Sequence, residues 1–214
     1  MNINNEVDLI RRKLKSENDF SSNPIDLSLG VIPPFIGSSD IKLIIIGQDP
    51  TIKNVASRKN ITCTLNLDKK NALRTYIHGI CSELGITIEN VYATNLFKYF
   101  YTIPPAETME VLRSHLKPNL ALLQQELEGF KNIPLIALGE PVLRLLTHEN
   151  DKVREYWDYN PITGKSNGDF KFSQAIDNKL LRDFYPFPHQ PSIRKVFYKN
   201  TFAKYLKFMK TSLM

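Results

Sequence analysis

Residues 42–49 read KLIIIGQD and are followed by Pro50. Four large aliphatic side chains in succession suit a parallel β-strand that is covered on both faces. Gly47 lets the backbone turn immediately after this strand. Gly-x-Asp-Pro is an ordinary turn sequence, but ligand sites in open α/β sheets gather at the carboxyl ends of strands. Asp49 is therefore a candidate catalytic residue, placed by a rigid element.

The rest of the chain alternates between strand-like and helix-like patterns. Further strands are predicted at 91–97, 134–138 and 184–187. Between them, apolar residues recur at helical spacing; Pro118 predicts a break in one helix, and Asp68 is expected to cap another that Gly85 ends. We therefore expect an α/β fold, a three-layer αβα sandwich with a central, mainly parallel four-stranded sheet.

The length of 214 residues suits one core better than two, so residues 1–214 are expected to form a single domain. Within it, residues 1–35 are predicted to hold a peripheral helix and a linker. Residues 149–179 are polar and poorly periodic, which indicates a surface excursion.

The composition excludes several classes of protein. No apolar run approaches the roughly 20 residues that cross a bilayer, and the first residues lack the apolar stretch of a secretory signal. We therefore expect a cytoplasmic protein without membrane contact and, because no residue pattern argues for an obligate oligomer, a monomer. Two cysteines, Cys63 and Cys81, are too few for a disulfide framework or a four-thiolate iron–sulfur site, and no metal or cofactor is expected. The absence of a glycine-rich phosphate loop argues against a nucleotide-handling enzyme.

The net charge of +6 favours a polyanionic partner, and its distribution is informative. Residues 194–210 hold six basic and no acidic side chains, interleaved with aromatic ones. This pattern is typical of an amphipathic helix that buries its rings and leaves its cations in solvent. It is equally compatible with a surface that binds phosphates, because a packed helix still presents its charged side.

Three separated segments resemble the uracil-DNA glycosylase superfamily. They are GQDP at 47–50, YATNLF at 92–97 and HQPSIRK at 189–195. Members of that family carry a Gly-Gln-Asp-Pro segment after the first strand, a base-reading asparagine after a middle strand and a His-Pro-Ser loop near the C-terminus. The resemblance covers roughly residues 40–205, and the segments occur in the same order.

The resemblance implies an enzyme that hydrolyses the bond between deoxyribose and uracil, or a related deaminated base, in DNA during base-excision repair. Asp49 would stabilise positive charge on the sugar and orient the attacking water, and His189 would donate a hydrogen bond to the departing base. The base itself would be bound by Gln48, Thr51, Cys63 and Asn95, of which the asparagine matches the edge of uracil.

Single- or double-stranded DNA is the implied partner, with the target base flipped out of the stack. Ile193 or Arg194 is the expected wedge, although Gln190 interrupts the usual His-Pro-Ser spacing and shifts its register. The expected DNA-contacting residues are Pro50, Ser57, Arg58, Ser192, Ile193, Arg194 and Lys195.

Two departures from the family pattern leave an alternative open. Thr51 stands where a tyrosine excludes the thymine methyl group, and Cys63 aligns with a phenylalanine that stacks on uracil. The threonine opens space, and loss of the ring forfeits about 1–3 kcal/mol of stacking. The alternative is a non-catalytic member of the fold that binds DNA or abasic sites.

Overall fold

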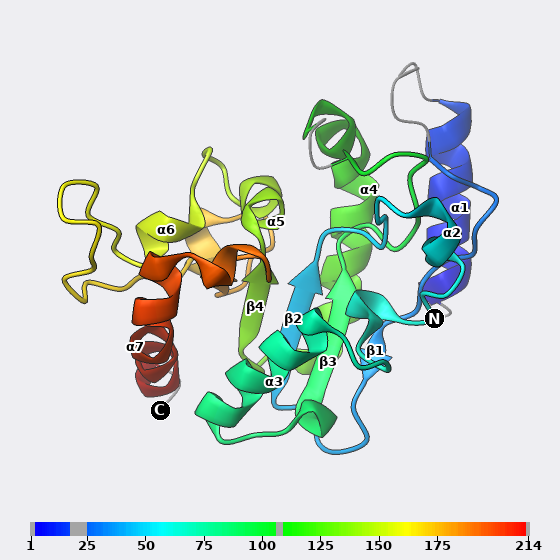
Figure 1. The fold of residues 1–214 in the computed structure, drawn as a ribbon. Coiled ribbons are helices and arrows are strands. Elements are labelled where there is room, and N and C mark those ends of the chain that lie inside the picture. Colours follow the sequence, from blue (N-terminus) through cyan, green and yellow to red (C-terminus); the bar gives the residue numbers. More distant parts are fainter. Residues whose placement is uncertain (1–2, 18–24, 106–108, 213–214) are drawn as a thin grey trace.

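The centre of the structure is a five-stranded sheet with the order β1-β3-β2-β4-β5 (Figure 1). The computed structural model describes residues 3–17, 25–105 and 109–212. The strands are β1 (Phe35–Ile36), β2 (Leu43–Gly47), β3 (Val91–Asn95), β4 (Leu135–Leu138) and β5 (Tyr185–Phe187). The four predicted strands are present and mutually parallel, but the expected count of four was wrong. A two-residue strand, β1, extends the edge antiparallel to β3 and is too short to show a pattern in the sequence.

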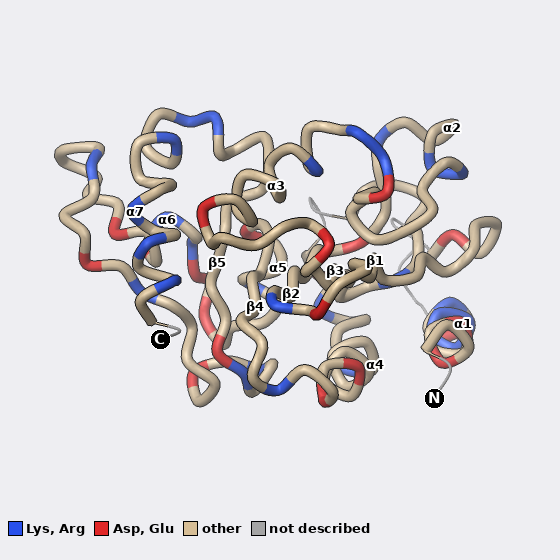
Figure 2. Tube along the Cα trace, turned by 90° about the horizontal axis from the view of Figure 1, so that it is seen from below, with Lys and Arg blue, Asp and Glu red and all other residues tan. Residues whose placement is uncertain are grey.

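Helices cover both faces of the sheet. They are α1 (Ile3–Ser16), α2 (Val55–Arg58), α3 (Ala72–Leu84), α4 (Met109–Leu127), α5 (Glu140–Leu146), α6 (Val153–Tyr156) and α7 (Val196–Ser212). Figure 2 shows α3 on one side of the sheet and α4, with α1, on the other, which confirms the three-layer αβα arrangement. None of the helices in the described part of the chain is long and apolar enough to cross a bilayer.

The parallel strands end together at one edge of the sheet. Every residue of β2, β3, β4 and β5 is buried, as expected for strands covered on both faces. In the ladder, Gly47 pairs with Asn95 and Leu138 pairs with Phe187. The segments that follow these strands therefore start from the same edge.

Two local expectations about helices were wrong. Pro118 lies inside α4, which continues through it without a break. The helix α3 is capped by Asn71, whose Oδ1 accepts from the Arg74 amide at 2.8 Å, whereas Asp68 accepts from the thiol of Cys63. Gly85 does end α3, in the left-handed conformation with φ of 75°.

The segment 149–179, predicted as a surface excursion, contains one large buried side chain. Its Trp157 is fully buried, donates from Nε1 to the Pro186 carbonyl at 2.8 Å and stacks on Tyr205 with ring centroids 4.4 Å apart. The tryptophan ties this segment to β5 and α7, in a region that the sequence showed only as polar. Of the linker expected before residue 35, residues 18–24 lie outside the described part of the chain.

A buried ion pair fixes the end of β3 to α4. The Lys98 ammonium lies 2.8 Å from the Glu126 carboxylate, and both side chains are almost fully buried. Lys98 also donates to the Asn95 carbonyl at 2.8 Å, while the Glu126 carboxylate accepts from Tyr92 at 2.7 Å and from Thr94 at 2.9 Å. Because each charge has several partners, the network holds β3 and the residue that ends it in one position.

Removal of one charge from this pair should destabilise the fold strongly. Glu126→Ala leaves the Lys98 ammonium buried without its counter-ion, so urea unfolding should show a loss of about 3–5 kcal/mol. The double variant Lys98→Met/Glu126→Gln removes both charges, keeps an acceptor for Tyr92 and Thr94, and should recover most of that loss. A loss below about 1 kcal/mol in Glu126→Ala would contradict a structural role for the pair.

Candidate active site

Asp49 leaves the end of β2 with its carboxylate fixed by its neighbours. Oδ1 accepts from the Thr51 amide at 2.7 Å, and Oδ2 accepts from Gln48 Nε2 at 2.6 Å. The first contact is the local turn that an aspartate forms with the backbone two residues on. Each oxygen is thus held by one short hydrogen bond, and the orientation of the carboxylate is set before any ligand arrives.

The surroundings of Asp49 change its acidity. Burial raises the pKa of Asp49 to about 6, against the opposing effects of the hydrogen bonds from Thr51 and Gln48 and of the Arg58 charge. The carboxyl group therefore titrates well above an ordinary aspartate and is ionised at neutral pH. A carboxylate in this range has the basicity suited to orienting or activating water.

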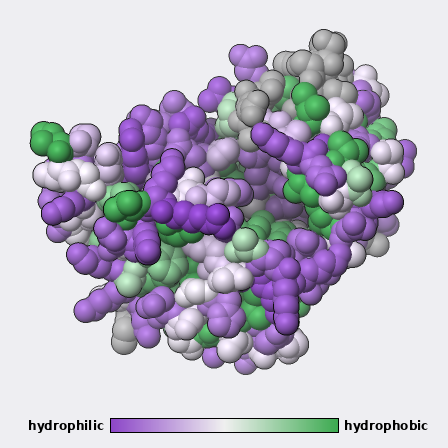
Figure 3. Space-filling model, viewed as in Figure 1, coloured by the Kyte–Doolittle hydropathy of each residue, from purple (hydrophilic) through white to green (hydrophobic). Residues whose placement is uncertain are grey.

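A cavity of about 650 Å³ opens beside this carboxylate. Three neighbouring strands contribute to its wall with their last residues or with the residues that follow: 47–51 from β2 onward, Leu138 and Gly139 at the end of β4, and His189 after β5. Figure 3 shows the same face of the molecule hollowed near its middle. Asp49 and His189 thus share one cavity at the carboxyl edge of the sheet, in the size range of small-molecule sites.

His189 stands at the rim of the cavity. It is exposed, and its Cβ packs close to Gly139, which adopts a positive φ of 97°. Although His189 is exposed overall, the protein around it desolvates the ring enough to lower the pKa of His189 below its ordinary value, so the neutral imidazole predominates at neutral pH. A neutral imidazole donates one hydrogen bond and accepts another, and it serves as a donor beside a group that gains negative charge.

Asn95 lies next to the cavity without lining it. The side chain is 1% exposed, and its Oδ1 has no hydrogen-bond partner among the described residues. The same oxygen packs so closely on Gly47 that a Cβ there would stand only 2.4 Å away. Glycine at position 47 is therefore required by the close approach of the neighbouring asparagine, and not by a positive φ, which Gly47 does not adopt. The sequence placed Asn95 at the right edge of the sheet but did not show that it lies behind the wall.

Two residues predicted to contact the ligand or DNA are buried elsewhere. Arg58 is 2% exposed, and its guanidinium donates to the carbonyls of Ile52, Tyr101 and Thr102, so it is turned away from any phosphate at the surface. Cys63 is 8% exposed, donates to Asp68 and does not line the cavity. Neither position was evident from the sequence, because both depend on contacts between distant segments.

Other predicted residues do line the cavity, together with some that the sequence did not reveal. Gln48, Pro50, Thr51 and Ser57 all contribute to the wall. The unpredicted lining residues include Leu65, Asn66, Lys69, Asn71, Pro104 and Pro105. Leu65 and Asn66 hold successive positive φ angles of 57° and 51°, a strained turn that no sequence motif announces.

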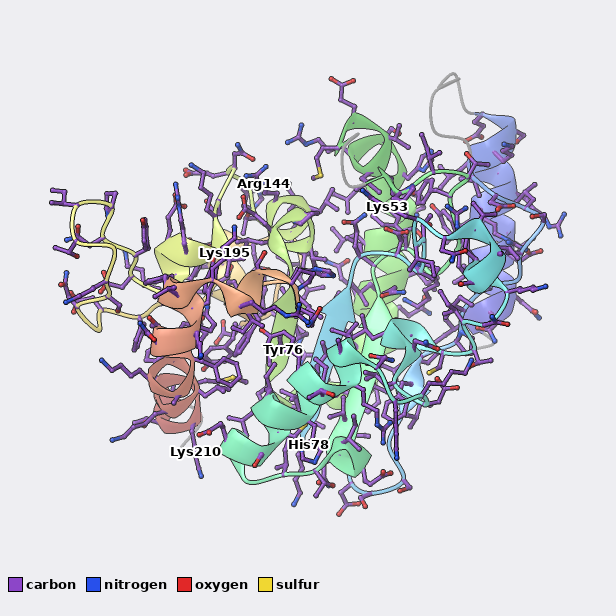
Figure 4. The ribbon with its side chains drawn as sticks, viewed as in Figure 1. Lys53, Tyr76, His78, Arg144, Lys195 and Lys210 are labelled. Carbon is purple, nitrogen blue, oxygen red and sulfur yellow. The ribbon has the colours of Figure 1, made fainter. Side chains whose placement is uncertain are left out.

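The loop after His189 presents the remaining predicted residues. Ser192–Arg194 forms a single tight turn, begun by a hydrogen bond of 2.8 Å from the Ser192 amide to the His189 carbonyl. Ile193 is half-buried, whereas Arg194 and Lys195 are exposed. Figure 4 shows Lys195 on this loop and Lys53 on the opposite side of the same face. Neither lysine lines the cavity, whose wall includes the cation of Lys69.

Within the described residues, no group of three or more His, Cys, Asp and Glu side chains is placed to hold a metal ion.

Comparison with protein families identifies a matching family. The sequence model of the Uracil DNA glycosylase superfamily matches residues 33–210, most of the chain. The matched region includes all the strands and every segment that lines the cavity. Among the curated proteins compared with the chain, none matches it.

The raised pKa of Asp49 predicts a gain in stability when its charge is removed. The folded state, with a pKa of about 6, binds a proton more tightly than the unfolded chain, so the carboxyl group lowers stability as pH rises from about 4 to 6. Asp49→Asn should therefore be more stable than the wild type at pH 7.5, by about 1–3 kcal/mol in urea unfolding, and equal to it near pH 4.

Asp8→Asn is the matched control, because Arg12 and Arg11 lower the pKa of Asp8. Here the sign reverses: the variant should lose stability at pH 7.5 and match the wild type at low pH. If Asp49→Asn proves less stable than the wild type at pH 7.5, the description of a desolvated carboxylate is wrong.

Proposed function

Because the chain belongs to the uracil DNA glycosylase superfamily, we propose that it is a monofunctional DNA glycosylase. It hydrolyses the bond between deoxyribose and uracil, or a related deaminated base, and leaves an abasic site. The observation that carries the proposal is that Asp49 and His189 line one cavity at the edge where the parallel strands end. One side chain supplies a negative charge and the other a hydrogen-bond donor, the pair that this cleavage needs.

The reaction separates charge. As the bond between C1′ and the base nitrogen breaks, its electron pair leaves with the base and positive charge develops on the sugar. The Asp49 carboxylate stabilises that cation and orients the water that attacks C1′; as the C1′–O bond forms, the water gives one proton to the carboxylate, and the departed base anion takes up a proton from solvent. The neutral His189 imidazole donates to the base oxygen on which negative charge accumulates. The carboxylate is already oriented by its hydrogen bonds before the substrate binds, so it reorganises little during the step.

The cavity wall supports binding of a flipped-out base. The Asn95 amide lies directly behind Gly47, and its unpaired oxygen and its amino group match the donor and acceptor edge of uracil. Leu65 provides an apolar surface in the wall, which favours a flat base over a charged ligand. Asn95 does not line the cavity, so reading by its amide requires the wall beside Gly47 to open when the base enters.

The alternative function is binding without cleavage. Cys63 lies outside the cavity and Thr51 offers no ring, so this chain lacks the stacking and methyl-excluding side chains expected of a uracil-specific enzyme. A member of the fold that binds DNA or abasic sites needs neither. Binding that falls steeply with salt, without release of any base, would select this alternative.

Base release tests the proposed reaction directly. The wild type should release uracil, or hypoxanthine or xanthine, from single-stranded oligonucleotides, and Asp49→Asn should lose about 100-fold or more in kcat while it still binds DNA. Below pH about 6, kcat should fall tenfold per pH unit, because the reaction requires the ionised form of Asp49. A wild type that is inert on all three substrates would exclude the enzyme.

The role of His189 is tested by a matched pair of variants. His189→Ala removes the donor and should lower kcat by about 10²–10³-fold, whereas His189→Gln keeps an N–H group and should retain more activity. The two variants should have similar KM values, because the donor acts mainly in the transition state. If both variants were as active as the wild type, His189 would have no role in catalysis.

The exposed cations of the loop before α7 should bind phosphates. Arg194→Ala/Lys195→Ala removes two of them, so the slope of log Kd against log salt concentration should fall by about 2. Lys210→Ala, at the far end of α7, is the control and should leave the slope unchanged (Figure 4). A double variant with the wild-type slope would place the DNA on another surface.

A further inference from the structure

Arg58 is a buried cation without a carboxylate beside it. It is 2% exposed, and its three hydrogen bonds, of 2.8, 2.8 and 3.0 Å, all go to backbone carbonyls. Among the described residues, no carboxylate oxygen lies within ion-pair distance of its guanidinium. Burial of a charge without a counter-ion costs free energy, so the buried position of Arg58 suggests that its charge has a role in this part of the protein.

The guanidinium joins two segments that meet beside Asp49. Through Nε it holds the Ile52 carbonyl, in the loop after β2, and through Nη1 it holds the carbonyls of Tyr101 and Thr102, in the segment after β3. One side chain thus bridges the segments that follow two adjacent strands of the sheet. The five donors of arginine in a rigid plane suit such a bridge better than a single ammonium group does.

A continuous chain of contacts leads from Arg58 to the carboxylate. Arg58 donates to the Tyr101 carbonyl, and the Tyr101 amide donates to the Thr51 hydroxyl at 2.8 Å. The Thr51 amide then donates to Asp49 Oδ1 at 2.7 Å. Thr51, which departs from the family pattern, therefore has a structural role, because its hydroxyl links the Asp49 turn to the segment that Arg58 holds.

The charges around Asp49 also single out this arginine. The titratable groups that face it are Arg58, Tyr99 and Tyr101, His115 behind the tyrosines, and His189 and Lys69 on the cavity wall. Burial raises the pKa of both tyrosines and lowers that of His115 to about 4, so all three are neutral near pH 7. Of the described cations, Arg58 is therefore the buried one whose charge lowers the pKa of Asp49, whereas Lys69 lines the solvent-accessible cavity.

We propose that Arg58 is a positioning residue for Asp49: it clamps the segments after β2 and β3 together and offsets the charge of the carboxylate from inside the protein. The proposal rests on the function proposed above, because it assigns how that site keeps its carboxylate oriented and charged. It replaces the expectation that Arg58 contacts DNA. An interior cation serves a hydrolytic site better than a surface one, since it is neither screened by salt nor occupied by phosphates.

The experiment compares Arg58→Met, Arg58→Lys and the control Lys59→Met, which removes a charge from the adjacent exposed position. The first readout is the titration of the Asp49 carboxyl carbon by NMR, without DNA. Its midpoint should move up by about one pH unit in Arg58→Met. It should stay close to the wild-type value in Arg58→Lys, which keeps the charge, and in Lys59→Met.

The second readout is base release. Arg58→Met should lower kcat by about 100-fold with KM within a few-fold of the wild type, and move the acidic limb of its pH profile upward with the titration. Arg58→Lys should lower kcat less, because the charge remains while the clamp is weakened. If Arg58→Met does not fold, Arg58→Lys replaces it as the test. The expected result for that variant is a reduced kcat with an unchanged midpoint of the Asp49 titration.

Two outcomes would overturn the proposal. A Met variant with the wild-type midpoint shows that Arg58 does not act on Asp49, and a variant that loses DNA binding at unchanged kcat shows a phosphate contact instead. Because the titration needs no substrate, it gives its answer even if the wild type releases no base, so failure of this proposal is separate from failure of the proposed function.

Discussion

The Asp49 carboxylate is desolvated by the protein around it, held by hydrogen-bond donors and influenced by the charge of the buried Arg58, and these opposing effects set its pKa near 6. Burial alone would keep the group neutral, and full hydration would leave it weakly basic and freely rotating. The balance gives a carboxylate that is charged at neutral pH and fixed in direction. The site therefore depends on the elements that maintain the balance: a rigid strand, a local turn and the segment after β3.

Two buried cations organise this edge of the sheet in different ways. Lys98 pairs with Glu126 and fixes the end of β3, including the carbonyl of Asn95. Arg58 has carbonyl partners only, and it joins the same segment of chain to the turn that carries Asp49. The Lys98–Glu126 ion pair fixes the framework of the site. The hydrogen bonds of Arg58 connect the turn that carries Asp49 to that framework. Both lie in the protein interior, where salt screens them little.

Much of the fold was predictable because its signal is local. The apolar run of β2 and the polar residues after it placed Asp49 at the correct edge, and His189 reached the same cavity through β5. What the sequence did not reveal depends on distant contacts: the buried position of Arg58, the exclusion of Cys63 from the cavity and the burial of Trp157. In each case a polar or ambiguous local pattern was overridden by tertiary packing.

In the proposed reaction, the Asp49 carboxylate acts on the sugar and the His189 imidazole acts on the base at the two ends of one breaking bond. A crystal structure with an oligonucleotide that carries a non-hydrolysable deoxyuridine analogue would show whether the two side chains lie there. The base should occupy the cavity with an oxygen accepting from His189, and a water on Asp49 should lie about 3–3.5 Å from C1′. A bound base outside this cavity, or a sugar whose C1′ faces away from Asp49, would contradict it.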